Sequence, residues 1–299
     1  MKRSSAVLLA VVALFITTNA LAWGPDGHKI VCRIAFQLLD NDAQRAEVDR
    51  LTKAYQLPNG LPGYTSFPEA CTFADRARGN AQAGTTGWQQ FKQFDEWHFF
   101  NVPRSVKHVA ATFCLDNCVV HGIEFHSGQL GQMALGDQKR AEGLLFLGHW
   151  VGDVHQPLHV SYADDRGGNQ ITVKSAVFKQ TNLHSVWDSG FIGNTEGPGT
   201  DAWIALADRL KGAITPAQQT AWLTVATPLE WADESYTITI TPDVQYCRLT
   251  TAGGGSCNAI KKTRKPGKPY QQEFEPDVEQ RLQQAGVRLA ALIRQNLGK

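Results

Sequence analysis

Apolar positions recur at helical spacing in several long stretches of the chain. In residues 27–39 they fall on one face, which predicts a buried helix. Residues 122–154 carry apolar stripes that predict one or two long helices ending before Pro157. Residues 278–297 predict an amphipathic helix that packs on the body, and residues 69–78 predict a shorter helix. The pattern therefore predicts a mainly α-helical protein.

Strands are predicted in one short segment only. Residues 169–173 alternate apolar and polar side chains after Gly167 and Gly168, which predicts a short β-hairpin. Residues 241–270 combine a triple glycine with the basic run 261–268 and predict a long, poorly packed loop. No internal repeat or linker divides the sequence, so we expect a single domain.

The first 22 residues have the features of a secretory signal peptide. Lys2 and Arg3 precede an apolar run, and Ala20-Leu21-Ala22 forms a small-residue cleavage site. The run is about half of the roughly 20 residues that a spanning helix needs, so no membrane anchor is expected in the exported form. We expect residues 23–299 to be a monomeric domain that begins at Trp23 and is periplasmic or secreted.

The exported part carries no excess of positive charge. Without Lys2 and Arg3 the 29 basic residues fall to 27, against 28 acidic ones. Proteins that hold nucleic acid through lysine and arginine alone are clearly basic. If the ligand is a polyanion, a bound metal is the obvious source of the missing charge.

The six cysteines all lie in the exported part. An even number in an exported protein indicates disulfides. The sequence does not choose among the many pairings that six cysteines allow. Loop closure favours the pairs Cys32–Cys71, Cys114–Cys118 and Cys247–Cys257.

Two equal spacings place a histidine and an aspartate on one helical face. His149 precedes Asp153 by four residues, and His184 precedes Asp188 by four. Such a pair can chelate one metal ion, although similar pairs also occur on helix surfaces without metal. The segment around His149 is strongly apolar, so its polar side chains need a partner that offsets their desolvation. A metal would be such a partner.

Further candidate ligands lie near these pairs and at the expected N-terminus. His159 follows a proline break, and His155 is placed to orient a ligand; a hydrogen-bonded turn is the alternative for both. Cleavage before Trp23 would free an α-amino group that can chelate together with the Trp23 carbonyl and His28. The alternative is that this segment is only a flexible start.

Five segments, taken in order, resemble the S1/P1 nuclease family. The joined GHxxGDxHQPLH and NLHxxWD blocks are highly specific, and the resemblance spans nearly the whole exported part. The segments are Trp23-Gly-Pro-Asp-Gly-His28, Phe73-Ala-Asp75-Arg-Ala-Arg78, Trp97-His98-Phe99, His149-Trp-Val-Gly-Asp153-Val-His-Gln-Pro-Leu-His159 and Asn182-Leu-His184-Ser-Val-Trp-Asp188.

The resemblance implies a mainly α-helical, single-domain fold of the phospholipase C/P1 nuclease type, with three zinc ions in one cleft. The implied ligands form three sets. These are Asp75, His98, His149 and Asp153; the amino and carbonyl groups of Trp23 with His28 and a bridging Asp153; and His159, His184 and Asp188. All are nitrogen or oxygen ligands, which zinc accepts.

The same resemblance implies an endonuclease that hydrolyses single-stranded DNA and RNA to products with 5′-phosphates, and that also acts as a 3′-nucleotidase. Asp75 would steer the attacking water and Arg78 would contact phosphate oxygens. Phe99 would stack on a base, with Asn101 and Asn169 offering hydrogen bonds. Core packing is the alternative for Phe99.

Two positions depart from the family pattern. Phe73 stands where a tryptophan is common, which leaves the Asp75 ligand intact and affects only local packing. Asn101 stands where fungal members carry an acidic base-binding residue. The base preference is therefore open.

Two other functions fit the same ligands. A zinc-dependent phospholipase C shares the trinuclear site and the helical fold, but the HQPLH segment and Gly167-Gly168-Asn169 favour the nuclease. A non-catalytic zinc-binding protein would bind the metal without turnover, whereas open coordination positions suit catalysis. The basic run 261–268 is either a nucleic-acid patch or, as short runs usually are, a solvated loop.

Overall fold

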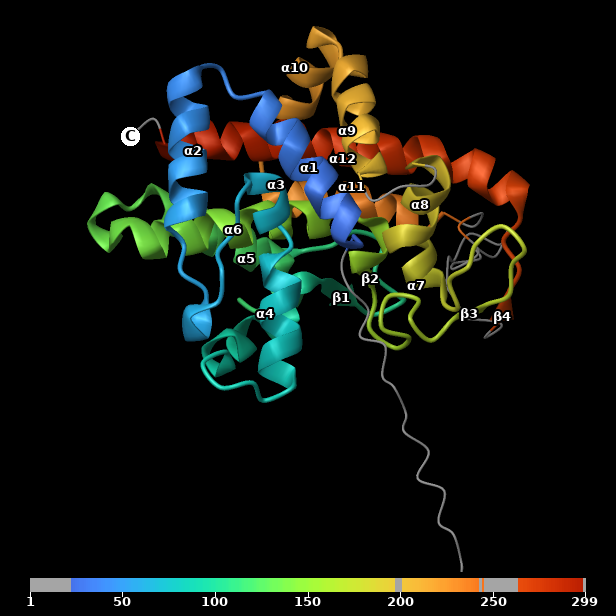
Figure 1. Ribbon diagram of the computed structural model, residues 1–299. Coiled ribbons are helices and arrows are strands. Elements are labelled where there is room, and N and C mark those ends of the chain that lie inside the picture. The colour runs from blue at the N-terminus through green and yellow to red at the C-terminus, as the bar shows by residue number, and fades with distance from the viewer. Residues whose placement is uncertain (1–22, 197–200, 242–243, 245–262, 298–299) are drawn as a thin grey trace, which may run out of the picture.

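The structure, a computed structural model, describes residues 23–196, 201–241, 244 and 263–297 (Figure 1). Within these residues helices dominate, as the sequence predicts. The longer helices are α1 (Pro25–Gln37), α2 (Asp42–Ala54), α4 (Phe73–Gln82), α5 (Val119–Gly131), α6 (Gly136–His155), α9 (Ala202–Ala213), α10 (Pro216–Thr224), α11 (Pro228–Thr239) and α12 (Lys268–Leu297). The shorter ones are α3 (Phe67–Ala70), α7 (Leu183–Ser185), α8 (Phe191–Glu196) and the 3₁₀ segments Pro58–Gly60, Gln89–His98, Ala111–Phe113, Met133–Leu135 and Pro157–His159.

Three predictions fall partly or wholly outside this part of the chain. The signal peptide (1–22), the Cys247–Cys257 pair and most of the loop predicted over 241–270 lie outside the described residues. Among the described helices, none is both long and apolar enough to cross a membrane.

Helix α6 forms the centre of the molecule. Every residue from Arg140 to His155 is buried, and the helix packs against α1, α2, α4, α5, α11 and α12. The long α12 runs across the molecule, with α1 crossing it (Figure 1). The stretch predicted as one or two helices is two, because the chain reverses near Gly136, whose φ of 73° favours glycine.

Two disulfides lie in the described residues. Cys32–Cys71 ties α1 to the junction of α3 and α4, and Cys114–Cys118 closes a turn before α5. Both pairs were predicted from the sequence. The first bond touches α6 at Gly148, where an added Cβ would lie 2.5 Å from the Cys71 sulfur. Helix α6 can therefore pass this close only with glycine at that position.

The predicted β-hairpin is present only in part, as an isolated antiparallel bridge between Thr172 and Asn182 in which the Val173 N–H donates to the Thr181 carbonyl at 2.8 Å. The strand β3 (Thr172–Val173) pairs in parallel with β4 (Thr263–Arg264), a segment far along the chain that was predicted as loop. The other pair, β1 (Phe100–Val102) with β2 (Val160–Tyr162), is also parallel. A short strand takes its partner from whichever backbone the tertiary fold brings beside it, and local alternation does not encode that partner.

The last helix begins ten residues before the predicted start, within the predicted loop. It opens at Lys268 and continues through Pro276, which cannot donate a helical hydrogen bond. Tyr270 and Phe274 are buried there, and the Phe274 ring lies 5.5 Å from that of Trp187. This aromatic packing stabilises a first part of the helix that the periodicity after residue 278 does not predict.

The C-terminal end of α6 is held by side chains from α11 and α12. The Ser235 hydroxyl donates to the Val154 carbonyl, and the Arg281 Nε donates to the His155 carbonyl at 3.3 Å. A guanidinium nitrogen of Arg288 lies 2.8 Å from the His155 Nε2, which accepts from it. Ser235 and Arg281 satisfy carbonyls that a helix end leaves without partners, and Arg288 holds the His155 ring, so the end of α6 is fixed in position.

Glu234 neutralises the two buried arginines of this contact. It lies 2.6 Å from both Arg281 and Arg288. Burial raises the pKa of Glu234, but hydrogen bonds and charges from Arg288 and Arg281 outweigh it, so the pKa lies below its usual value of 4.5. Glu234→Gln should lower the free energy of unfolding by about 2–3 kcal/mol at pH 7, because two buried charges lose their partner. Urea unfolding measures this.

The pH dependence follows from the lowered pKa. The stabilisation is present above about pH 4.5, the usual value, and is lost as the pH falls through the lowered folded-state pKa, so variant and parent should converge once the pH is below that pKa. Glu279→Gln is the matched control, since Glu279 has a similarly exposed side chain (27% against 28%) but pairs with the exposed Arg209. Glu279→Gln should lower the free energy of unfolding by less than about 1 kcal/mol. Equal losses in the two variants would contradict the role assigned to Glu234.

Candidate metal centre

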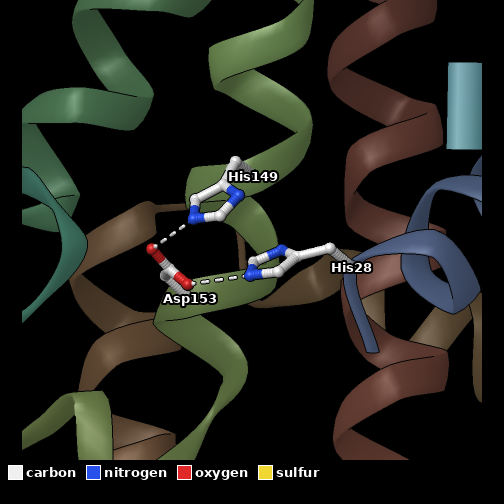
Figure 2. A group of neighbouring side chains, drawn as sticks. All are labelled: His28, His149 and Asp153. Carbon is white, nitrogen blue, oxygen red and sulfur yellow. Dashed lines mark ion pairs between the residues drawn. The ribbon is translucent and has the colours of Figure 1, made fainter. Parts of the chain in front are cut away.

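Asp153 lies at the centre of a cluster of buried histidines. One carboxylate oxygen is 3.4 Å from His28 Nε2 and the other is 3.3 Å from His149 Nε2. Figure 2 shows the two imidazoles, from α1 and α6, converging on this carboxylate. The rings of His28 and His149 are stacked with centroids 3.7 Å apart. The three side chains form the first group that could hold a metal ion.

Asp75, His98 and His149 form a second group that shares His149 with the first. Asp75 Oδ1 lies 3.7 Å from His98 Nδ1 and 3.6 Å from His149 Nε2. His98 Nδ1 is also 3.2 Å from Asp153. The His149 Nδ1–H donates to the Cys71 carbonyl at 2.8 Å, so its Nε2 carries the lone pair that faces both groups.

His159, His184 and Asp188 form the third group. The Nδ1–H of His159 donates to the His98 carbonyl at 2.5 Å, and that of His184 donates to the Gly167 carbonyl at 2.6 Å. Both Nε2 atoms therefore carry lone pairs, yet they lie only 3.1 Å apart. Two lone pairs facing each other repel unless a cation binds both, so the donor set fits a metal ion.

Burial and charge also favour a cation here. Among the described residues, both ring nitrogens of His28 and one oxygen each of Asp75 and Asp153 are buried without a hydrogen-bond partner. Burial raises the pKa of Asp75 to about 8 and of Asp188 to about 7, and raises that of Asp153 well above its usual range. Several carboxyl groups this close ionise together only when positive charge is bound among them.

Burial has the opposite effect on the histidines. It lowers the pKa of His149 to about 3 and those of His159 and His184 to about 4, and lowers those of His28 and His98 well below 6.5. The imidazoles are therefore neutral at ordinary pH. Neutral imidazole is the form that binds metal.

Local structure explains how distant segments meet at this centre. The parallel pairing of β1 and β2 aligns Phe100 with Val160, so the preceding His98 and His159 lie together. Asn182 caps α7 by accepting from the Ser185 N–H at 2.8 Å. The chain then continues through a π-helical turn, Val186–Gly190, which carries Asp188. Such turns are frequent at functional sites.

Trp23 is fully buried beside the centre. The Gly24 N–H donates to the Asp188 carbonyl at 2.8 Å. An added Cβ at Gly152 would lie 2.7 Å from His28 Nδ1 and 3.7 Å from the Trp23 ring, so glycine on α6 makes room for both residues. The first described residues are thus fixed next to the ligand groups.

A cavity of about 250 Å³ opens beside the third group and is lined by His159 and His184. The predicted substrate residues Arg78, Phe99, Asn101 and Asn169 all line it. The Arg78 guanidinium lies 5.9 Å from the centre of the Phe99 ring. Phe99 is partly exposed and therefore not a core residue, which leaves its face available to a ligand.

The structure brings every predicted histidine and aspartate ligand into one of the three groups, but it does not bring His155 to a ligand. The His155 ring nitrogens contact Val151 and Arg288 instead. The sequence reasoning missed Gln156, whose side chain donates to Asp188 and accepts from the Leu158 N–H. Its place in the HQPLH block was the available signal. It also missed the cavity-lining residues Glu96, Leu158 and Arg166.

Comparison with known proteins points to the same family as the sequence motifs. Residues 23–298 match the family model described as S1/P1 Nuclease. The chain is 31% identical to Endonuclease 2 of Arabidopsis thaliana over 311 residues, which cover 98% of this chain and 96% of the relative. It is 28% identical to Nuclease S1 of Aspergillus oryzae over 187 residues (58% and 60%) and 28% identical to Nuclease P1 of Penicillium citrinum over 137 residues (42% and 50%).

Proposed function

Because the chain belongs to the S1/P1 nuclease family, whose members are phosphodiester-cleaving hydrolases, we propose that it is a zinc-dependent endonuclease specific for single-stranded DNA and RNA. Its products would carry 5′-phosphates, and it would also release phosphate from 3′-nucleotides. Three zinc ions per chain would be held by the three groups around Asp153, Asp75 and Asp188.

The observation that carries this proposal is the arrangement of lone pairs beside a cavity that can take a nucleotide. The Nε2 atoms of His159 and His184 face each other at 3.1 Å and line that cavity together with Arg78 and Phe99. A mixed set of imidazole nitrogens and carboxylate oxygens, without cysteine, suits zinc. Bound zinc would supply positive charge that polarises the phosphate and makes water more acidic.

The chain's own residues would position the substrate and handle the proton. Asp75, with one buried oxygen that lacks a partner, would orient the attacking water and accept its proton. Arg78, whose Nε is likewise buried without a partner, would hold phosphate oxygens. Phe99 would stack on a base, with Asn101 and Asn169 at its edge. Stacking needs an unpaired base, which favours single strands.

Residues 1–22 would be the signal peptide, and the exported domain would begin at Trp23. The α-amino and carbonyl groups of Trp23 would complete the ligand set of His28 and Asp153. The two disulfides of the described chain support export to an oxidising compartment, and the buried position of Trp23 supports its place beside the ligand groups.

The proposal predicts loss of activity on metal removal. Protein that begins at Trp23 is dialysed against a chelator and assayed on single-stranded DNA and RNA, and on a duplex of the same sequence. Activity on the single strands should fall by more than about 10³-fold and return with zinc, and the duplex should be cleaved poorly throughout. A mock-dialysed sample is the control.

Other outcomes would contradict the proposal in different ways. Undiminished activity in metal-free protein would exclude the metal-dependent mechanism. Tight zinc binding without turnover would favour a zinc-binding protein. Faster hydrolysis of phosphatidylcholine than of RNA would favour a phospholipase C.

A further inference from the structure

Arg166 lies at the candidate active-site cavity and carries a positive charge. It belongs to none of the three ligand groups, and the proposed base-stacking site at Phe99 does not use it. It lines the cavity together with Arg78. The side chain is exposed, and no carboxylate of the described residues lies within ion-pair distance of it. The same holds for Arg78, whereas most other described arginines form ion pairs. Two guanidiniums thus meet one carboxylate, that of Glu96, in a single cavity.

The loop that carries Arg166 is fixed in position. Arg166 has a φ of 58°, an uncommon left-handed conformation for a residue other than glycine. Its carbonyl accepts from the Asn169 side chain at 2.7 Å, and its N–H donates to the Ala163 carbonyl at 3.3 Å. The buried Asp165 accepts from the Gly168 N–H at 2.9 Å. Hydrogen bonds from neighbouring residues therefore hold the backbone of Arg166 in this strained conformation. Its side chain lies at the cavity as a result.

The same loop belongs to the candidate metal centre. The carbonyl of Gly167, the next residue, accepts from His184 Nδ1 at 2.6 Å. The hydrogen bond between Gly167 and His184 thus fixes the backbone next to Arg166 relative to the third ligand group. A preorganised guanidinium without a protein partner is suited to bind an oxyanion, since its planar fork matches phosphate oxygens.

We infer that Arg166 forms a second phosphate subsite, which takes a phosphate next to the one being cleaved. The inference rests on the proposed function and adds to it a preference for chains with at least two phosphates. Arg78 serves the reacting phosphate beside the ligand groups, and Arg166 serves its neighbour. A substrate with one phosphate leaves Arg166 without a ligand. The protein should therefore prefer oligonucleotides to dinucleoside monophosphates.

The test compares substrates that differ only in phosphate number. The substrates are a dinucleoside monophosphate, the same compound with a 5′- or a 3′-terminal phosphate, and a tetranucleotide. Arg166→Asn removes the charge and keeps a residue that tolerates the left-handed backbone. It should lower kcat/KM about tenfold on the tetranucleotide and on one of the phosphorylated dinucleotides, and less than about twofold on the dinucleoside monophosphate. Arg166→Lys should restore part of the loss.

Salt dependence gives an independent reading. The slope of log kcat/KM against log salt on the tetranucleotide should become shallower by about 0.7 in Arg166→Asn, as expected when one phosphate contact is lost on a single strand. Arg209→Asn, which removes the same charge on α9 away from the cavity lining, should leave both readings unchanged.

The possible failures can be told apart. Equal loss on all substrates, or no loss on any, together with an unchanged salt slope would overturn the second subsite and leave the nuclease proposal intact. Failure of the unaltered, zinc-loaded protein to cleave any of these substrates would overturn the proposed function itself.

Discussion

Replacing Asp153 with asparagine should abolish turnover, with kcat/KM on single-stranded DNA falling by more than about 10³-fold, or about 4 kcal/mol. Asp153 lies within 3.2–3.4 Å of nitrogens of His28, His98 and His149. Its two oxygens face two candidate groups, so one substitution removes negative charge from both. The effect should exceed the 10–100-fold loss typical of a residue that only orients a ligand.

Metal content distinguishes this role from a general loss of structure. Elemental analysis of Asp153→Asn should show fewer zinc ions per chain than the parent protein, while its metal-free form should be at least as stable as the metal-free parent. That stability is expected because the substitution removes one of several buried carboxyl groups that repel each other. Asp208→Asn, on α9 and paired with Arg33, is the matched control and should retain metal and activity. Full metal occupancy with normal activity in Asp153→Asn would contradict the assignment.

Keeping residues before Trp23 should also lower activity strongly, although less than the loss of Asp153. A protein that begins at Leu21 should have about 10–100-fold lower kcat/KM than one that begins at Trp23. In the longer protein the Trp23 nitrogen is part of a peptide bond and is no longer a free amine that could bind metal. Trp23 is fully buried, and the Gly24 N–H donates to the Asp188 carbonyl. The added residues would therefore have to fit among the closely packed side chains of the candidate metal centre. Rates and zinc content of the two proteins, with N-terminal sequencing of each, measure the effect.

The matched control adds the same two residues after Lys299, where they should change neither rate nor zinc content. Full activity in the N-terminally extended protein would exclude the terminal chelate. It would leave the three side-chain groups untouched, because none of them uses the backbone of Trp23.

Several parts of the candidate site follow from local sequence. The spacing of four between His149 and Asp153, and between His184 and Asp188, fixes each pair on one turn of helix, and the structure has them 3.3 and 3.5 Å apart. Asn182 caps its helix as its side chain predicts. Helical turns are local, so a sequence pattern is enough to specify them.

Other predictions failed where the contact partner lies far along the chain. The strand at Thr172 pairs with residue 263, and the first turns of α12 depend on Tyr270 and Phe274 packing near Trp187. His155 was predicted to orient a ligand, but Arg288 of α12 binds its ring instead. No local pattern contains these partners.

The sequence by itself determined the helical class and the two His–Asp pairs, because these depend on residue type and short spacing. Loop closure only favoured the two disulfide pairs, and the other candidate ligands were implied by the resemblance to the family. Only the tertiary structure decided which nitrogen of each imidazole faces its group, how the three groups meet around α6, and that Arg166 shares a cavity with Arg78. Those features depend on burial and on contacts between distant segments. They arise only when the chain packs.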